Sequence, residues 1–413
     1  MAHDEDIQIE PQLVTLPETG LWTKLPLVGG VVGVLALAAS FLLGGGGHAA
    51  GEHGGHGNPL AASYLVAFLY WWTLAMGGLF FSVLHYLARA GWSVVVRRLA
   101  ENVMGTLPLF LLLFLPIRFL WMHDLFHWTD AEAVANDDLL QHKVPYLNEG
   151  FFTLRAFIYF TIWLAIAWVF YRQSHRQDES GDIDITRRLN KWSALGMVGF
   201  AVTITFASFD WIMSLEPHWF STIFGVYVFA GSVVAILSFL VFLVIRLQSA
   251  GVLRGLVTGE HFHDLGKLLF GFIVFWAYIG FSQFMLIWYA NIPEETLWFD
   301  ARWHHGWQPV SIFLAVGHFA FPFFFLISQP VKRNRPLMTF AALWVLFMHY
   351  VDIYWMVVPS LHLGDFHPRL TDFTCWLGIG GLFIAFFGVL MQKGSLVPTK
   401  DPRLSESVAF ESV

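Results

Sequence analysis

Ten long apolar runs fill most of the sequence, and they constrain the fold more than any other feature. A helix that crosses the roughly 30 Å hydrocarbon core of a bilayer needs about 20 mainly apolar residues. The ten runs are Leu25–Leu43, Leu60–Leu87, Asn102–Met122, Phe151–Tyr171, Trp192–Met213, Phe220–Ile245, Leu268–Ala290, Trp307–Ile327, Leu337–Val358 and Phe373–Met391. Only 13% of all residues are charged, whereas about 25% is usual in soluble domains. The short alternating segments of an outer-membrane barrel are absent. The sequence therefore predicts an all-α polytopic membrane protein with ten transmembrane helices.

Basic residues in the connections predict how these helices are oriented. Of the 23 Lys and Arg residues, 18 fall on the side that carries both terminal tails, 3 fall on the opposite side and 2 lie within the runs. Cytoplasmic connections of membrane proteins carry the excess of Lys and Arg. We therefore expect both termini to be cytoplasmic. The acidic start MAHDEDIQIEPQ lacks the basic residues and prompt apolar core of a cleaved signal peptide.

Charge and cysteine content exclude several kinds of chemistry. The net charge is −7, so we expect no nucleic-acid partner. The only cysteine is Cys375, and a lone thiol allows no internal disulfide, no C-x-x-C-H haem attachment and no cysteine-ligated iron–sulfur cluster. Electrons would therefore travel through partner subunits. The histidines of HAAGEHGGHG could bind a metal, but that stretch lacks fixed geometry, so we expect no metal site.

A repeated pattern predicts two related halves. The fifth span ends in DWIMSLEP from Asp210 and the ninth in DIYWMVVP from Asp352, and each aspartate lies seven residues before a proline. If spans two to five correspond to spans six to nine, the copies share one orientation because each contains four helices. Coincidence of a two-letter pattern is the alternative. The expected organisation is a tail (1–24), the first span with its outer loop (25–59), two four-helix bundles (60–214 and 215–359), an outer loop with the tenth span (360–391) and a second tail (392–413).

Ionisable residues inside the spans are the first candidate site. Such a group costs about 2.5–3.5 kcal/mol at the bilayer centre on insertion scales. Asp352 follows His349 by three residues and shares its helix face, and a carboxylate beside an imidazole can hold, accept or relay a proton near neutral pH. The alternative is a hydrogen-bonded pair that locks two helices together. We favour proton transfer, with Asp210 and His318 as further candidates.

Acids and histidines near the ends of the spans extend the list of proton-transfer candidates. His85 and Glu101 come from neighbouring spans near the inner surface and could form the mouth of a proton path. The simpler interpretation is that both side chains are solvated at the membrane interface. Asp124 is a further candidate near the outer surface.

Polar side chains in spans seven and nine are candidates for lining a polar pocket. Tyr278 and Ser282 are four residues apart, Gln283 lies on a neighbouring face, and Tyr354 belongs to span nine. Hydrogen bonds between helices would explain span seven equally well.

Two runs carry a resemblance to a known family. The runs are SFDWIMSLEPHWFST, which starts at Ser208, and FWAYIGFSQFMLIWYANIPEE, which starts at Phe275. With them, nearly the whole chain resembles the polysulfide-reductase-type (NrfD-like) quinone-interacting membrane subunits. It is most similar to the F-type subunit of alternative complex III, the bacterial quinol:cytochrome c oxidoreductase. The resemblance implies ten helices, two four-helix bundles and a place in the bacterial inner membrane.

The resemblance also implies partners and cofactors. The partners would be membrane lipid, a related ten-helix quinone-binding subunit, an iron–sulfur subunit, c-type cytochromes, small membrane subunits and a terminal oxidase. Haem and iron–sulfur centres would lie on those partners, and no cofactor would be covalently bound to this chain. A menaquinone, a ubiquinone or a lipid is the small molecule that the polar pocket would accept. In this family the better-supported quinol pocket belongs to the sister subunit.

These observations favour a membrane subunit that supports quinol oxidation and proton transfer in a respiratory complex. Two alternatives remain open at this point. The chain could be a structural anchor for cytochromes, with its acids in helix-locking pairs, or a secondary transporter with parallel repeats.

Overall fold

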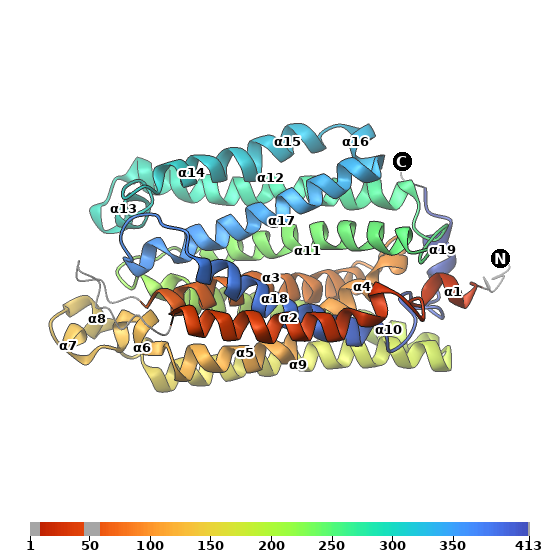
Figure 1. The fold of residues 1–413 in the computed structure, drawn as a ribbon, viewed down its shortest axis with the longest axis horizontal. Helices are drawn as coiled ribbons and strands as arrows, with labels where there is room; N and C mark the ends of the chain where they lie inside the picture. The colour runs from red at the N-terminus through yellow and green to blue at the C-terminus, as the bar shows by residue number, and fades with distance from the viewer. Residues whose placement is uncertain (1–8, 45–57, 412–413) are drawn as a thin grey trace.

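The computed structural model describes residues 9–44 and 58–411, and this part of the chain contains helices but no strands (Figure 1). The segment HAAGEHGGHG lies outside the described residues. Within them, ten helical segments are long and apolar enough to cross a membrane. The predicted all-α fold and the number of spans are confirmed, and the chain is a multi-pass membrane protein by these criteria.

The spans lie side by side along the long axis of the molecule (Figure 1). They are α2 (Leu21–Gly44), α3 (Pro59–Leu87), α4 (Val94–Met104) with α5 (Leu107–Phe119), α9 (Glu149–Ser180), α10 (Ile183–Trp211), α11 (Phe224–Ser249), α12 (Gly259–Ala290), α14 (Gln308–Leu314) with α15 (Phe321–Leu326), α17 (Arg335–Val357) and α18 (Leu370–Met391). The short helices are α1 (Pro11–Val14), α6 (Met122–Leu125), α7 (Ala131–Ala135), α8 (Asp138–Lys143), α13 (Pro293–Asp300), α16 (Gln329–Arg333) and α19 (Leu404–Val408).

Helices α3 and α11 form the centre of the molecule. Both are apolar on all sides, as expected of helices surrounded by other helices, and nearly all of their residues are buried. Adjacent glycines allow α3 to approach two neighbours closely. A Cβ on Gly77 would collide with Ser232 and Ile236 of α11, and one on Gly78 would press against Ala100 of α4. Small residues let transmembrane helices pack at short distance in this way.

The remaining spans pack around this centre in two groups. Helices α4, α5, α9 and α10 contact α3, whereas α12, α14, α15 and α17 contact α11 or one another. Helices α2 and α18 pair with each other, where Gly29 and Gly33 of α2 meet the backbone of Gly378 and Gly381 of α18. This packing is compatible with the two expected bundles, and the repeat itself stays a prediction.

Both tails fold back onto the end of the molecule where α2 begins. The carbonyl oxygen of Leu13 accepts a hydrogen bond from the Leu253 amide (2.7 Å), and that of Val14 accepts one from Leu396 (2.6 Å). The hydroxyl of Ser407 donates to the carbonyl oxygen of Trp92 (2.7 Å). The tails, for which the sequence suggested no contacts, therefore close one end of the helix bundle.

Candidate functional site

Asp352 is held in the interior by three different helices. It lies on α17, five residues before the last residue of that helix, and is 1% exposed. The hydroxyl of Tyr227, in the first turn of α11, donates to Oδ1 at 2.6 Å. The indole N–H of Trp276, in the middle of α12, donates to Oδ2 at 3.0 Å. Both donors are neutral, and no Lys, Arg or His forms an ion pair with Asp352 within the described residues.

His349 lies one turn earlier on the same face of α17. Its Nε2 is 2.9 Å from the hydroxyl oxygen of Thr73 on α3, and that hydroxyl donates its own hydrogen to the Tyr70 carbonyl oxygen. Nε2 must therefore carry a hydrogen and donate it to Thr73. This leaves Nδ1 as the acceptor of the neutral ring, and Nδ1 is buried without a hydrogen-bond partner in residues 9–44 and 58–411.

His349 and Asp352 meet around a glycine rather than bonding directly. A Cβ on Gly231 of α11 would lie 3.1 Å from Cε1 of His349 and 3.8 Å from Oδ2 of Asp352. No hydrogen bond joins the imidazole to the carboxylate within the described residues. The absence of a side chain on Gly231 thus leaves room between the two groups and the neighbouring helix.

His318 completes this cluster from α14 and α15. It lies in a π-helical segment, Ala315–Ala320, which joins the two helices, and its ring packs against Trp276 with centroids 4.1 Å apart and ring planes inclined at 36°. Pro322 has no N–H to donate to the carbonyl of residue 318, which favours local rearrangement of the helix. The indole N–H of Trp344 donates to the Gly317 carbonyl oxygen at 2.7 Å and so satisfies part of the disturbed backbone.

The buried nitrogens of His318 distinguish this position from an ordinary core histidine. The residue is fully buried, and neither Nδ1 nor Nε2 has a hydrogen-bond partner within the described residues. Trp276 thus contacts both the His318 ring and the Asp352 carboxylate. We refer to Thr73, Tyr227, Trp276, His318, His349 and Asp352 as the Asp352 cluster. Short π-helical segments often mark functional positions.

Asp210 has a very different environment. It is fully buried near the end of α10, and its two oxygens accept hydrogen bonds from Nε and Nη2 of Arg155 on α9, at 2.8 and 2.9 Å. Tyr159 donates a third hydrogen bond at 2.8 Å, and Tyr146 stacks on the guanidinium at 3.8 Å. Asp210 is thus one half of a bidentate ion pair, and it does not join the Asp352 cluster.

Glu101 belongs to a buried ionic network at the opposite end of the bundle. Its oxygens are 3.4 Å from Nε of Arg97 and 2.9 Å from Nε of Arg98. Arg97 also pairs with Asp401 of the tail at 2.5 Å, and Arg98 pairs with Asp178 at 2.8 Å. Glu101 itself is fully buried. The interpretation of Glu101 as a group wet at the interface is therefore wrong.

His85 and Asp124 are placed separately from one another and from the Asp352 cluster. His85 is also buried, so it is not wet at the interface, and its Nδ1 lies 2.7 Å from the Phe81 carbonyl oxygen. Asp124 is half-buried and accepts a hydrogen bond from Asn58 at 2.9 Å. These two residues stay candidates for proton transfer by sequence alone.

The candidate polar pocket is dispersed over different faces. Tyr278 is 64% exposed on the outer face of α12, and Ser282 is half-buried. Gln283 is buried, and its amide nitrogen has no partner within the described residues. Tyr354 donates instead to Asp372 of α18 at 3.1 Å.

A chain of four titratable side chains joins the connections at the end of the bundle opposite the two tails. Oδ2 of Asp137 is 2.6 Å from Nε2 of His218, and Glu216 lies 3.5 Å from Nδ1 of His218 and 3.2 Å from Nε2 of His362. We refer to these four residues as the outer cluster.

The pKa values of the acids and of His362 in the outer cluster shift in opposite directions. Hydrogen bonding to His218 lowers the pKa of Asp137, and hydrogen bonding to Glu216 raises the pKa of His362. Burial works to raise the pKa of Glu216, but the two histidines outweigh it and lower that pKa.

Sequence reasoning did not single out Tyr227, Trp276, Thr73 or Asp372. Tyrosines and tryptophans are frequent throughout the spans, so no local signal separates the two that bond to Asp352. Asp372 lies in the first turn of α18, where an acid is an ordinary helix-start residue. The spacing of histidines and acids alone does not indicate a metal site, and no group of three or more such residues could hold a metal ion in the described part of the chain.

Comparison with protein-family models gave no match, and comparison with curated proteins gave none either.

Proposed function

We propose that the chain is an integral membrane subunit of a respiratory quinol:cytochrome c oxidoreductase of the alternative complex III type. The resemblance of the runs from Ser208 and Phe275, together with ten apolar helices, supports this assignment. The excess of Lys and Arg on one side supports cytoplasmic termini in a bacterial inner membrane. The proposed partners are a related ten-helix quinone-binding subunit, an iron–sulfur subunit, c-type cytochromes and small membrane subunits.

Within that complex, the Asp352 cluster exchanges protons. The observation that carries this proposal is the buried carboxylate of Asp352, which has two neutral donors and no cationic partner in the part of the chain that the structure describes. An isolated charge in a low-dielectric interior is strongly unfavourable, so a buried carboxylate without a counter-charge is disposed to take up a proton. Quinol oxidation releases two protons with its two electrons, and those protons need acceptors.

The two histidines give the proton a route beyond Asp352. Among the described residues, nothing bonds to Nδ1 of His349, which lies next to Gly231, or to either ring nitrogen of His318. Each ring can accept a proton on one nitrogen and release one from the other. The room beside Gly231 and the π-helical segment permit small movements of these rings. The three residues thus form a short proton-conducting series between α17 and α14–α15.

The test is Asp352→Asn in the assembled complex. The amide keeps the shape of the side chain, and its oxygen can accept the hydrogen bond from the indole of Trp276 while its NH2 group donates to the hydroxyl oxygen of Tyr227, so assembly is expected to be normal. Loss of a proton-transfer group typically lowers turnover by about 100-fold or more, and we expect this loss in quinol turnover or in proton release. Asp130→Asn is the control, because Asp130 is an exposed acid outside the cluster whose capping bond to the Glu132 amide asparagine can keep. Unchanged turnover and unchanged proton stoichiometry in Asp352→Asn would exclude the proposed role.

A structural anchor is the second candidate function, and a specific observation favours it. The ion pair between Asp210 and Arg155 and the ionic network around Glu101 are satisfied contacts that hold helices and a tail together. If anchoring were the whole function, Asp352→Asn would lower the yield of the complex and leave the specific activity of the remaining complex unchanged. The ratio of activity to assembled protein separates the two candidates.

A further inference from the structure

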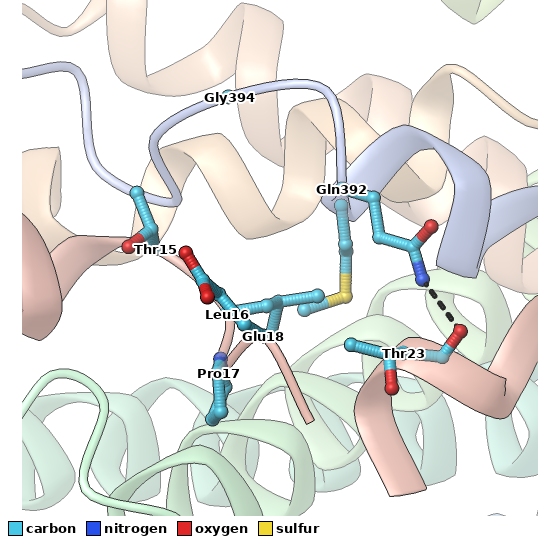
Figure 2. Close-up of a pocket in the computed structure, with 8 residues that line it drawn as sticks. Thr15, Leu16, Pro17, Glu18, Thr23, Gln392 and Gly394 are labelled. Carbon is cyan, nitrogen blue, oxygen red and sulfur yellow. Dashed lines mark hydrogen bonds between the residues drawn. The ribbon is translucent and has the colours of Figure 1, made fainter. Parts of the chain in front are cut away.

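A hollow of about 280 Å³ lies where the N-terminal segment meets the end of α18 (Figure 2). Its lining residues are Thr15, Leu16, Pro17, Glu18, Thr23, Met391, Gln392 and Gly394. Because α2 begins at Leu21 and α18 ends at Met391, the hollow lies at the boundary of the membrane-spanning region. This is the depth at which lipid head groups lie against a membrane protein.

Both threonine hydroxyls in the lining have already donated their hydrogen. Oγ1 of Thr15 donates to the Pro11 carbonyl oxygen at 2.8 Å, and Oγ1 of Thr23 donates to the Gly20 carbonyl oxygen at 2.9 Å. A hydroxyl has a single hydrogen and two lone pairs. Each threonine therefore offers the hollow only an acceptor.

Gln392 and Glu18 present acceptors as well. The amide nitrogen of Gln392 donates to the carbonyl oxygens of Trp22 (3.2 Å) and Thr23 (3.1 Å), and Figure 2 shows the second of these bonds as a dashed line. Its Oε1 accepts no hydrogen bond from the part of the chain that the structure describes. The carboxylate of Glu18 is drawn at the rim of the hollow (Figure 2) and has no hydrogen bond or ion pair within the described residues. The polar side chains thus offer acceptors and one negative charge.

The chemistry of this lining specifies its ligand. We propose that the hollow binds the head group of a membrane lipid that carries a primary ammonium, such as phosphatidylethanolamine. A primary ammonium has three N–H donors and a positive charge, which match the acceptors and the Glu18 carboxylate. The apolar side chains of Leu16, Pro17 and Met391 provide a surface for the adjoining carbons of the lipid. This inference is independent of the proposed respiratory function.

The experiment compares lipids that differ only in the head group. The full-length protein in detergent is incubated with phosphatidylethanolamine, phosphatidylcholine or phosphatidylglycerol of identical acyl chains, and native mass spectrometry measures the bound lipid. Phosphatidylcholine keeps the positive charge but lacks N–H donors, and phosphatidylglycerol carries a net negative charge. We expect phosphatidylethanolamine to bind about fivefold better than either, which is the effect of one exposed charge-assisted contact.

The variant Glu18→Gln tests the site itself. It should abolish the preference for phosphatidylethanolamine, whereas Glu10→Gln should preserve it, because Glu10 is an exposed acid on the same segment that does not line the hollow. Equal binding of phosphatidylcholine in the unaltered protein would overturn the proposal. So would a preference for phosphatidylglycerol, which would indicate that the amide groups at the start of α2 dominate. An unchanged preference in Glu18→Gln would also overturn it.

Discussion

Asp210 and Asp352 occupy equivalent places in the sequence and opposite electrostatic environments in the structure. Each lies near the end of a span, seven residues before a proline. Asp210 receives two hydrogen bonds from the guanidinium of Arg155, whereas Asp352 receives its hydrogen bonds from a phenol and an indole. Both carboxylates are buried. The counter-charge on a neighbouring helix, rather than the local sequence motif, therefore decides whether a buried acid is held in its charged form.

The difference leads to distinct expectations for the two acids. A buried carboxylate with a bidentate arginine is held in its charged form, and removing one partner leaves an uncompensated charge. A buried carboxylate with neutral donors has no such constraint and can gain or lose a proton with little rearrangement. Changes at the Asp210 pair should therefore affect folding, and changes at Asp352 should affect proton exchange.

The largest effect is expected when the counter-charge of Asp210 is removed. Arg155→Gln leaves the Asp210 carboxylate buried without a cation, and breaking such a pair typically costs about 3–5 kcal/mol. Thermal denaturation in detergent should show a strongly destabilised protein with low yield. The double variant Arg155→Gln with Asp210→Asn removes both charges and should recover part of the stability. If Arg155→Gln alone were as stable as the unaltered protein, the Arg155 counter-charge would not be what distinguishes Asp210 from Asp352.

A smaller loss of stability is expected at Glu101, which resembles Asp210 in its contacts. Glu101→Gln weakens the hydrogen bonds to Arg97 and Arg98, but each arginine keeps a second carboxylate, from Asp401 and Asp178. We expect a loss of about 2–3 kcal/mol in the free energy of unfolding, with normal activity in the protein that remains folded. A selective loss of proton transfer at full stability would instead place Glu101 with Asp352.

The outline of the fold follows from hydropathy because long apolar runs must cross the bilayer. Hydropathy alone places the start of the third span too late in the sequence. It begins at Val94 rather than at Asn102, because Arg97, Arg98 and Glu101 form ion pairs with one another and with Asp401 and Asp178 inside the protein. A hydropathy count treats each of these charges as solvent-seeking, and it contains no information about partners on distant segments such as Asp401.

The candidate site was only partly predictable for the same reason. The pair His349 and Asp352 was evident because ionisable residues within a span are costly. The donors Tyr227 and Trp276 come from two other helices, and the free nitrogens of His318 depend on a π-helical segment. Such facts depend on how the helices pack. The cation that separates Asp210 from Asp352 is likewise visible only in three dimensions.

A moderate effect is expected from filling the space beside the Asp352 cluster. In Gly231→Ala the new Cβ would lie 3.1 Å from Cε1 of His349, so the imidazole must shift. Overpacking of this kind costs about 1–3 kcal/mol, and we expect slower proton release in the folded protein. The control is Gly271→Ala, because a Cβ there meets nothing within 4 Å and alanine favours the helix. Equal activity in the two variants would contradict a role for this space.

The smallest effect is a pH dependence that arises in the outer cluster. The folded-state pKa of His362 is raised, so its contribution to stability is fully present below the unfolded value of about 6.5 and is lost as the pH rises through the folded value. The pKa of Glu216 is lowered, so its contribution is present above about 4.5 and is lost as the pH falls through the folded value. Lys143 and Arg302 also interact with Glu216, and burial lowers the pKa of each; a guanidinium nevertheless stays protonated in this pH range.

Both contributions therefore coincide between about pH 4.5 and 6.5. Because His362 is largely exposed, the fall in stability above this range should be below about 1 kcal/mol. Thermal denaturation from pH 5 to 9 measures it. His362→Asn should flatten the curve on the alkaline side, and His305→Asn, which alters an exposed histidine beside Asp365, should leave it unchanged. An identical curve in His362→Asn would exclude the outer cluster as the source of this pH dependence.

We propose that Asp352 exchanges a proton during quinol oxidation and that Asp210 does not. Infrared difference spectroscopy of the assembled complex during quinol oxidation measures this directly, because a protonated carboxyl group has its own carbonyl-stretch band, which shifts in D2O. We predict that such a band changes during turnover, disappears in Asp352→Asn and persists in Asp130→Asn. A spectrum without a carboxyl band, or one that Asp352→Asn leaves intact, would contradict the claim.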